Sequence, residues 1–483
     1  MFTKKIFLFF FAALFFATSF LFAEYNSFGI PDSSEIRKKL KREWFEGPLS
    51  ELRTFGTEIC KNSVGIEFQV SIEEQEDTFI LIVAPRSEVK VNLYDSSGMH
   101  VKTEYTYSSG SPGSWILVRD KKSGAPILAR YYFAKDSEVY IQFRADKKKS
   151  CFADMLIFNS YAARAVPLGI PFEKFYTASL AEIHDFTKRT LPWNYVIAAK
   201  TLSKEESQNL RTYDGIYDES LVMIQSIREN LDDIVYLDDT IYDEHGNPVS
   251  LENGKAKIIP KEYENNLTLC SQGFVKWIVD GIVEPLAGSY LRREPLLVET
   301  VDLQATGYQG IKATSYNINS ALDWTRNLAA AAASVVARKV ILYKDSGVDV
   351  TEEPFAAGIT EKGIVNMAGY IKNSGYRVAY LKQLLYVLAA RYPDYFYLAA
   401  IRQTDAGEKI DTRIFNECAV IFPYFDTNGA FRTVVFYDGK EYALEEFCDA
   451  CLNNNAGDVF VHLVRVRTTA KYYLQTAKGK KHD

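Results

Sequence analysis

The spacing of apolar residues changes twice along this chain, and these changes limit what it can fold into. Between about residues 62 and 161, short runs such as 78–83 and 139–143 alternate apolar and polar side chains, with Ser, Gly and Pro between the runs. That pattern is typical of a β-sandwich. Helical spacing follows over about 172–236, and helices and β-rich runs share the remainder. The sequence therefore predicts an α+β protein with a β-sandwich-like N-terminal domain.

The N-terminus has the order of a secretory signal peptide. Lys4 and Lys5 precede an apolar run over residues 6–23 that is rich in Phe, Leu and Ala. Cleavage after Ala23 fits this run, and cleavage after Ser19 is the alternative. A run of about 18 apolar residues also sits at the lower edge of what spans a bilayer, so an uncleaved anchor stays open. We expect an exported protein, periplasmic or at the cell surface, with membrane attachment only through this segment if it is retained.

Length and charge restrict the domains and the partners. A chain of 483 residues suggests two or three domains. The formal net charge is −6, whereas a nucleic-acid partner would favour a basic face, so we expect no nucleic acid. The predicted layout is a signal peptide (1–23), a β-rich domain (24–165), a helical connector (166–235) and an α+β domain (236–483).

The cysteines do not form a disulfide scaffold. An even number in an exported protein permits disulfides, but six are few for this length. Cys448 and Cys451 have the spacing of a redox or metal pair, yet they follow an amphipathic helical stretch and no second pair accompanies them. We expect two half-buried helical thiols there, and no metal or cofactor. The six are Cys60, Cys151, Cys270, Cys418, Cys448 and Cys451.

A polar loop enters an apolar helix at residues 269–277, which carry a cysteine, a serine and a glycine. Unpaired backbone amides and the positive end of the helix dipole stabilise a thiolate at such a place, which would lower the pKa of Cys270. The helix is expected from about Ser271 to Val283. Two further helices are predicted at about 321–336 and 376–390, and an antiparallel sheet at about 395–401, 419–425, 431–437 and 459–466.

The sequence Cys270-Ser271-Gln272-Gly273-Phe274-Val275 resembles the Asp-Cys-Ser-Gly-Phe-Val signature of NlpC-type, papain-like cell-wall cysteine peptidases. The resemblance covers about residues 230–470. It implies a papain-like domain in which a cysteine attacks an amide carbonyl of a peptidoglycan peptide. A histidine on a following strand would take the proton, and a third polar residue would orient the imidazole.

This chain departs from the family signature in two ways. When the two signatures are aligned without a gap, the family's nucleophile corresponds to Ser271. Only a one-residue insertion makes it correspond to Cys270, and one residue on a helix is a rotation of about 100°. The family's histidine falls on or near Cys418. Because no histidine lies between His245 and His462, the resemblance leaves His462 as the candidate base and Asp438 as the orienting group.

Two functions follow as alternatives. In the first, the chain hydrolyses peptidoglycan peptides with Cys270 as nucleophile, His462 as base and Asp438 as a weak third member. In the second, it is a catalytically inactive scaffold that binds peptidoglycan or a cell-envelope protein. The distance between the Cys270 sulfur and the His462 ring distinguishes them, since a working pair lies within about 4 Å. His184 and His245 are expected at the surface.

Overall fold

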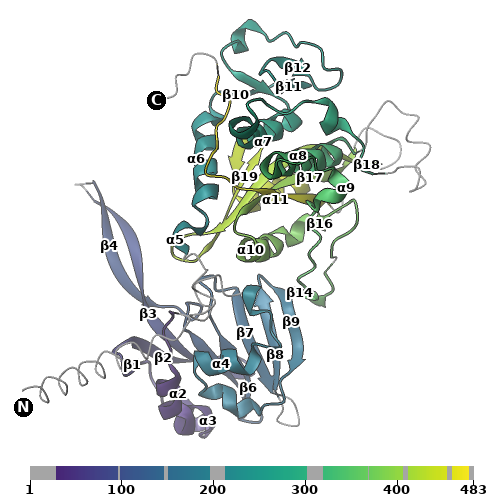
Figure 1. The fold of residues 1–483 in the computed structure, drawn as a ribbon. Coiled ribbons are helices and arrows are strands. Elements are labelled where there is room, and N and C mark those ends of the chain that lie inside the picture. Colours follow the sequence, from purple (N-terminus) through teal and green to yellow (C-terminus); the bar gives the residue numbers. More distant parts are fainter. Residues whose placement is uncertain are drawn as a thin grey trace, which may run out of the picture. The chain divides into compact units, whose positions relative to one another are not determined.

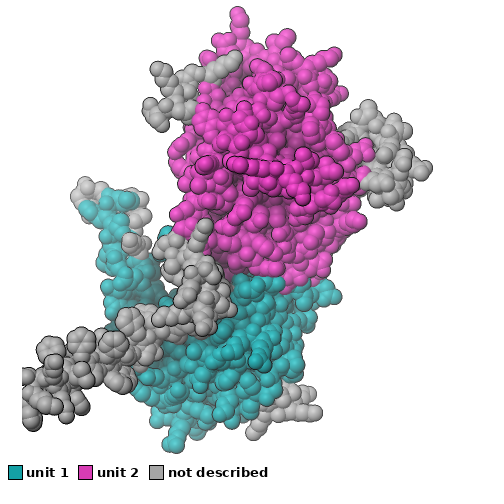
Figure 2. Space-filling view, in the orientation of Figure 1, with its two compact units in different colours: residues 1–213, 355–366, 427–430 teal, residues 214–354, 367–426, 431–483 magenta. Residues whose placement is uncertain are grey.

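The computed structural model describes residues 29–95, 98–145, 151–195, 213–301, 319–367, 369–405, 412–453 and 459–477. The fold is α+β, as predicted. Figure 2 shows two compact units, of which the first holds residues 1–213, 355–366 and 427–430 and the second holds residues 214–354, 367–426 and 431–483. The predicted signal peptide lies outside the described residues. Within these residues, no helix has the length and apolarity that crossing a membrane requires.

The first unit contains one antiparallel sheet of 11 strands (Figure 1). Hydrogen bonding runs unbroken in the order β1-β2-β3-β5-β6-β7-β8-β9-β14-β15, and β4 pairs with β3. A sandwich would have two sheets, so the predicted sandwich is corrected to a single sheet. The strands are β1 (Glu58–Lys61), β2 (Glu67–Glu74), β3 (Thr78–Asp95), β4 (Gly98–Tyr107), β5 (Trp115–Asp120), β6 (Pro126–Tyr131), β7 (Val139–Ala145), β8 (Cys151–Ile157), β9 (Ser160–Pro167), β14 (Ala357–Thr360) and β15 (Gly363–Val365).

Short helices bury aromatic side chains against this sheet. Phe45 packs on Trp115 with ring centroids 4.9 Å apart, and Phe175 stacks on Phe143 at 4.2 Å. The buried Arg37 donates to the Tyr131 hydroxyl at 2.8 Å, which ties the N-terminal helix to the sheet. The helical elements are α2 (Ser34–Leu40), η1 (Lys41–Phe45), α3 (Leu49–Leu52), η2 (Phe172–Tyr176), α4 (Leu180–Thr187) and η3 (Trp193–Tyr195).

The predicted helical connector is divided between the two units. Elements η2, α4 and η3 belong to the first unit, whereas α6 (Asp218–Leu231) belongs to the second. Both groups of helices bury apolar side chains within their own unit, such as Phe175 in η2 and Ile227 in α6. Over the described residues 172–195 and 213–231 the helical spacing was therefore read correctly, but it marks parts of two units instead of a separate layer.

The second unit is built on a six-stranded antiparallel sheet in the order β16-β21-β17-β18-β19-β20. Helices α7 (Ser271–Ala287) and α8 (Ser320–Ala337) share a buried core with one face of the sheet, and Phe422 of β18 belongs to this core. Phe425 points to the opposite face by alternation, and its ring centroid lies 5.0 Å from that of Tyr386 in α10. The strands of this sheet are β16 (Tyr376–Arg377), β17 (Tyr395–Asp405), β18 (Thr412–Phe425), β19 (Phe431–Tyr437), β20 (Lys440–Tyr442) and β21 (Phe460–Arg467).

Smaller elements surround this sheet. Strand β10 (Ile234–Tyr236) pairs in parallel with β13 (Leu267–Leu269), and β11 (Thr240–Tyr242) pairs with β12 (Pro248–Ser250). The helix expected from Ser271 is confirmed and continues as α7 to Ala287. The remaining helical elements are α5 (Tyr213–Ile216), η6 (Lys261–Tyr263), α7 (Ser271–Ala287), η7 (Glu294–Leu297), α8 (Ser320–Ala337), α9 (Tyr343–Ser346), η8 (Val378–Tyr380), α10 (Leu381–Arg391) and α11 (Leu444–Asn453).

Candidate functional site

The N-terminus of α7 is held tightly against β11. Cys270 is the N-cap residue, with extended backbone angles, and its N–H donates to the Thr240 carbonyl at 2.9 Å. The Cys270 carbonyl accepts the Phe274 N–H at 2.8 Å and begins the helix. A side chain at Gly273 would place its Cβ 2.5 Å from the Thr240 oxygen. Glycine at this position is therefore what lets the first turn of α7 approach the strand.

Helix α8 and strand β18 fix the same turn from other directions. The Trp324 indole N–H donates to the Gln272 carbonyl at 2.9 Å, and the Gln272 amide donates to the Asn416 carbonyl at 3.0 Å. The Cys418 N–H donates to the Ser271 hydroxyl at 3.1 Å. The hydroxyl of Ser271 lies 3.4 Å from the Cys418 carbonyl, to which it donates. This hydroxyl is thus engaged with the main chain of β18.

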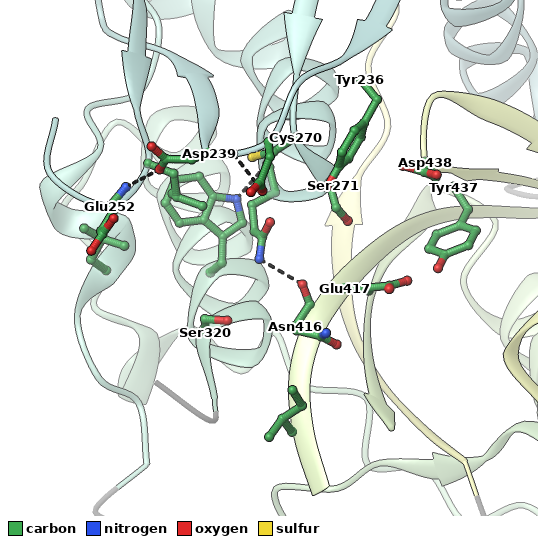
Figure 3. A pocket seen from close by; sticks show the side chains of 16 residues that line it. Tyr236, Asp239, Glu252, Cys270, Ser271, Ser320, Asn416, Glu417, Tyr437 and Asp438 are labelled. Carbon is green, nitrogen blue, oxygen red and sulfur yellow. Dashed lines mark hydrogen bonds between the residues drawn. The ribbon is translucent and has the colours of Figure 1, made fainter. Parts of the chain in front are cut away.

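A cavity of about 700 Å³ opens in front of this turn (Figure 3). Cys270 and Ser271 line it together with residues from β10, the segment before β11, β18 and the β19–β20 turn. Among its described lining residues there are carboxylates but no Lys, Arg or His. The carboxylates are Asp238, Asp239, Glu252, Glu417 and Asp438.

The carboxylates give the cavity a negative character. Burial raises the pKa of the Tyr236 phenol, and the neighbouring charges of Asp238, Asp438 and Glu417 raise it further. Asp239 is partly neutralised by Lys257, whose Nζ lies 3.1 Å away. Burial alone would raise the pKa of Asp239, but hydrogen bonds, one from Lys257 among them, outweigh burial and lower the pKa. Lys257 does not line the cavity, so its charge neutralises Asp239 from outside.

Burial determines the state of Cys270. The side chain is 3% exposed, and burial raises the pKa of the thiol from its ordinary 9.0 to about 11. Backbone amides of Gly273 and Gln272 lower the pKa, but by less than burial raises it. The helix N-terminus was expected to lower the pKa of this thiol; the opposite is found, because the thiolate would lose its hydration.

His462 lies in another network and is not brought to Cys270. Its ring is fully buried on β21, with Nε2 3.2 Å from Arg326 Nη2 and 3.3 Å from the Tyr370 hydroxyl. Asp349 Oδ2 is 3.5 Å from the same nitrogen. Burial lowers the pKa of His462, although Asp349 acts in the opposite direction.

The sheet register explains the separation. His462 lies opposite Ala400 of β17, and Ala400 lies opposite Cys418 of β18. Two strand spacings put the Cα atoms of His462 and Cys418 about 10 Å apart. Glu417, the neighbour of Cys418, lines the cavity, whereas Cys418 and His462 do not. The predicted nucleophile and base are therefore not a pair in this structure.

The other predicted residues have clear positions. Asp438 lines the cavity with Cys270 and Ser271. It forms a two-residue hairpin turn with Gly439, at φ of 51° and 70°, a conformation that Asp-Gly favours. Cys418 is fully buried, and burial raises the pKa of its thiol well above the ordinary value.

The sequence therefore pointed to three residues that line the cavity, Cys270, Ser271 and Asp438, and missed most of the other lining residues. Four of the cavity's carboxylates, Asp238, Asp239, Glu252 and Glu417, were not singled out. The tandem Asp238-Asp239, directly before a strand, was the signal available for two of these carboxylates.

The remaining cysteines and histidines lie elsewhere. Cys448 and Cys451 lie on α11 as the expected helical thiols, and burial raises the pKa of each to about 12. In the part of the chain that the structure describes, no group of three or more His, Cys, Asp or Glu side chains is placed to hold a metal ion. His184 on α4 packs edge-on against Trp193, 5.0 Å away.

Comparison with known proteins reaches only the first unit. Residues 26–195 match the model of a family described as a domain of unknown function (DUF8515). This segment carries most of the first sheet and none of the cavity. No curated protein and no solved structure matches the chain. The resemblance to NlpC-type peptidases therefore stays a prediction.

Proposed function

We propose that this chain is an exported cell-envelope protein whose second unit binds a peptide ligand without cutting it. The state of Cys270 carries the proposal: the thiol is buried, its pKa is raised to about 11, and His462 is engaged with Arg326, Asp349 and Tyr370. Cysteine catalysis needs a thiolate and a base within hydrogen-bond reach. Export rests on the apolar N-terminal run, and the choice of a cell-wall peptide rests on the NlpC resemblance.

The lining of the cavity favours a ligand that carries an ammonium group. Five carboxylates, and no described cationic side chain, surround the space in front of α7. An ammonium group there would make charge-assisted hydrogen bonds, which are about twice as strong as neutral ones. The Ser320 hydroxyl on the same wall donates to the Phe415 carbonyl at 3.0 Å, and its lone pairs can accept a hydrogen bond from a peptide N–H. A short peptide with a lysine-like side chain satisfies both features.

Calorimetric titration with a lysine-containing peptide and its Nε-acetylated form tests the ligand class. We expect the charged peptide to bind and the acetylated peptide to bind at least tenfold more weakly, with affinity falling as salt increases. Asp438→Asn and Glu417→Gln should each weaken binding by about 1–2 kcal/mol, because the amide oxygen still accepts a hydrogen bond but no longer carries a negative charge. Asp449→Asn, at an exposed site on α11 outside the cavity, is the matched control. Equal binding of both peptides would refute the proposed ligand.

Digestion of purified peptidoglycan tests the absence of catalysis. We expect no release of peptide fragments by the wild-type chain. Hydrolysis that disappears in Cys270→Ala would instead establish the peptidase hypothesis. The two assays are separate, so a failed ligand prediction does not by itself restore catalysis.

A further inference from the structure

Strands β3 and β4 extend beyond the first sheet as a two-stranded arm (Figure 1). Pairing of β3 with β5 ends at Val83 and pairing with β2 ends at Pro85, whereas pairing with β4 continues from Arg86 to Asp95. Within the described residues β4 pairs with β3 alone. Its outer edge therefore presents backbone N–H and C=O groups that can pair with another strand. A two-stranded ribbon is marginally stable by itself, so a further strand would stabilise it.

The side chains of β4 form two distinct rows. Met99, Val101 and Tyr105 share one face by alternation and are 57%, 57% and 53% exposed. Lys102 and Glu104 share the other face, with Lys102 Nζ 3.1 Å from Glu104 Oε1. Apolar side chains this exposed on one face of a projecting ribbon are typical of an interaction surface.

We propose that β4 pairs in antiparallel fashion with β4 of a second copy, about a two-fold axis at Thr103. In this register Lys102 faces Glu104 of the second copy, and the reverse contact follows by symmetry. On the other face, Val101 meets Tyr105 of the second copy, and Met99 meets Tyr107 of the second copy. The charges and the apolar side chains of one edge are thus both complementary to the same edge, as a two-fold interface requires.

Other registers lose this complementarity. An axis at Lys102 places that ammonium group opposite its own copy, and an axis at Glu104 does the same for the carboxylate, which is destabilising. An axis between two residues sets the apolar row of one copy beside the charged row of the other. A lone lysine on an edge strand opposes self-pairing. Lys102 and Glu104 carry opposite charges two residues apart, so they favour pairing of β4 with β4 of a second copy. They favour the axis at Thr103, because each charge then faces its opposite.

Charge reversal tests the pairing in sedimentation experiments on the full chain over a series of concentrations. We expect a concentration-dependent dimer for the wild type. Lys102→Glu gives an arm with two negative charges, and Glu104→Lys gives an arm with two positive charges. In a dimer of either variant like charges face each other across the interface, so each substitution alone should raise the dimer Kd by about tenfold. An equimolar mixture of the two variants should form a heterodimer. The Lys102–Glu104 ion pair within one strand is broken in both variants and stays broken in their mixture. If this pair only stabilised its own strand, mixing the two variants would not restore the dimer.

Cross-linking tests the register. Thr103→Cys places two thiols at the axis, where Cα atoms of facing strands are about 4.5–5.5 Å apart, within reach of a disulfide. Val101→Cys is the matched control, because its two copies would lie four residues apart along the strands, about 13 Å. Mild oxidation should give a covalent dimer for the first variant and not for the second. A wild-type monomer at every concentration, a dimer unaffected by either charge reversal, or equal cross-linking of both cysteine variants overturns the proposal.

Discussion

Alkylation of Cys270 by iodoacetamide tests the physical argument on which the proposed function rests. Only the thiolate reacts, so the rate follows the fraction of ionised thiol. Burial raises the pKa from 9.0 to about 11. At pH 8 about one thiol in 1,000 is then ionised, against about one in ten for an ordinary cysteine, a difference of about 100-fold. Because Cys270 is 3% exposed, limited access slows the reaction further.

The pH profile separates a buried thiol from an activated one. We expect the Cys270 rate to rise tenfold for each pH unit up to about pH 10, with no plateau below it. The half-buried Cys60 on β1 serves as an internal reference, since mass spectrometry quantifies both modified peptides in one sample. A rate that levels off below about pH 10 would refute the reasoning, because it would place the pKa of the thiol at its ordinary value or lower.

The same pKa predicts how stability changes at high pH. The folded state holds the Cys270 proton more tightly than the unfolded chain does. Stability from this group is therefore complete below pH 9 and is lost as the pH rises towards 11, by at most about 3 kcal/mol. Circular dichroism at each pH shows whether the alkylated protein is still folded, so that reaction of unfolded chains is not mistaken for activation.

Two further substitutions test the packing of the second unit by chemical denaturation. Gly273→Ala should destabilise by about 1–3 kcal/mol, because its Cβ would lie 2.5 Å from the Thr240 oxygen, whereas Gly56→Ala, with no atom within 4 Å, should be nearly neutral. Asp349→Ala should cost about 3–5 kcal/mol, because it leaves the buried Arg326 without its carboxylate partner at 2.7 Å. Burial would raise the pKa of Asp349, but His462 and Arg326 lower it well below 3.8, so this stability is present above pH 4 and is lost only at lower pH. Asp394→Ala, which breaks an exposed pair, should cost less than about 1 kcal/mol, and an equal loss for both aspartates would contradict the argument.

Local patterns predicted the elements well. The start of α7 at Ser271 and the strands of the second sheet follow from apolar spacing and turn residues, which act over a few residues. Strand β3 shows the limit of this reasoning. Residues 78–83 were expected as a short run of their own, yet they belong to one strand of 18 residues that continues through Pro85. The φ of proline fits extended backbone, so Pro85 does not end the strand.

Long-range contacts account for what the sequence could not provide. His462 was selected because it was the last credible histidine, and its surroundings depend on three distant segments that contribute Arg326, Asp349 and Tyr370. No local sequence pattern predicts that a strand histidine will be fully buried beside an arginine. The single sheet of the first unit is a further example, since its edge strands β14 and β15 come from residues 357–365, far along the chain.

Burial, to which the acidic cavity adds a smaller effect, explains why the helix N-terminus does not activate Cys270. A helix N-terminus or a neighbouring cation lowers the pKa of a thiol, whereas burial raises it. Here burial removes the solvent, the described cavity lining offers no cation, and the nearby Asp238 carboxylate raises the pKa further. The negative electrostatic field of the cavity carboxylates would attract an ammonium ligand, and the same field disfavours a thiolate at Cys270. Generating a cysteine nucleophile and binding the proposed cationic ligand place opposite demands on this cavity, and its five carboxylates are suited to the second.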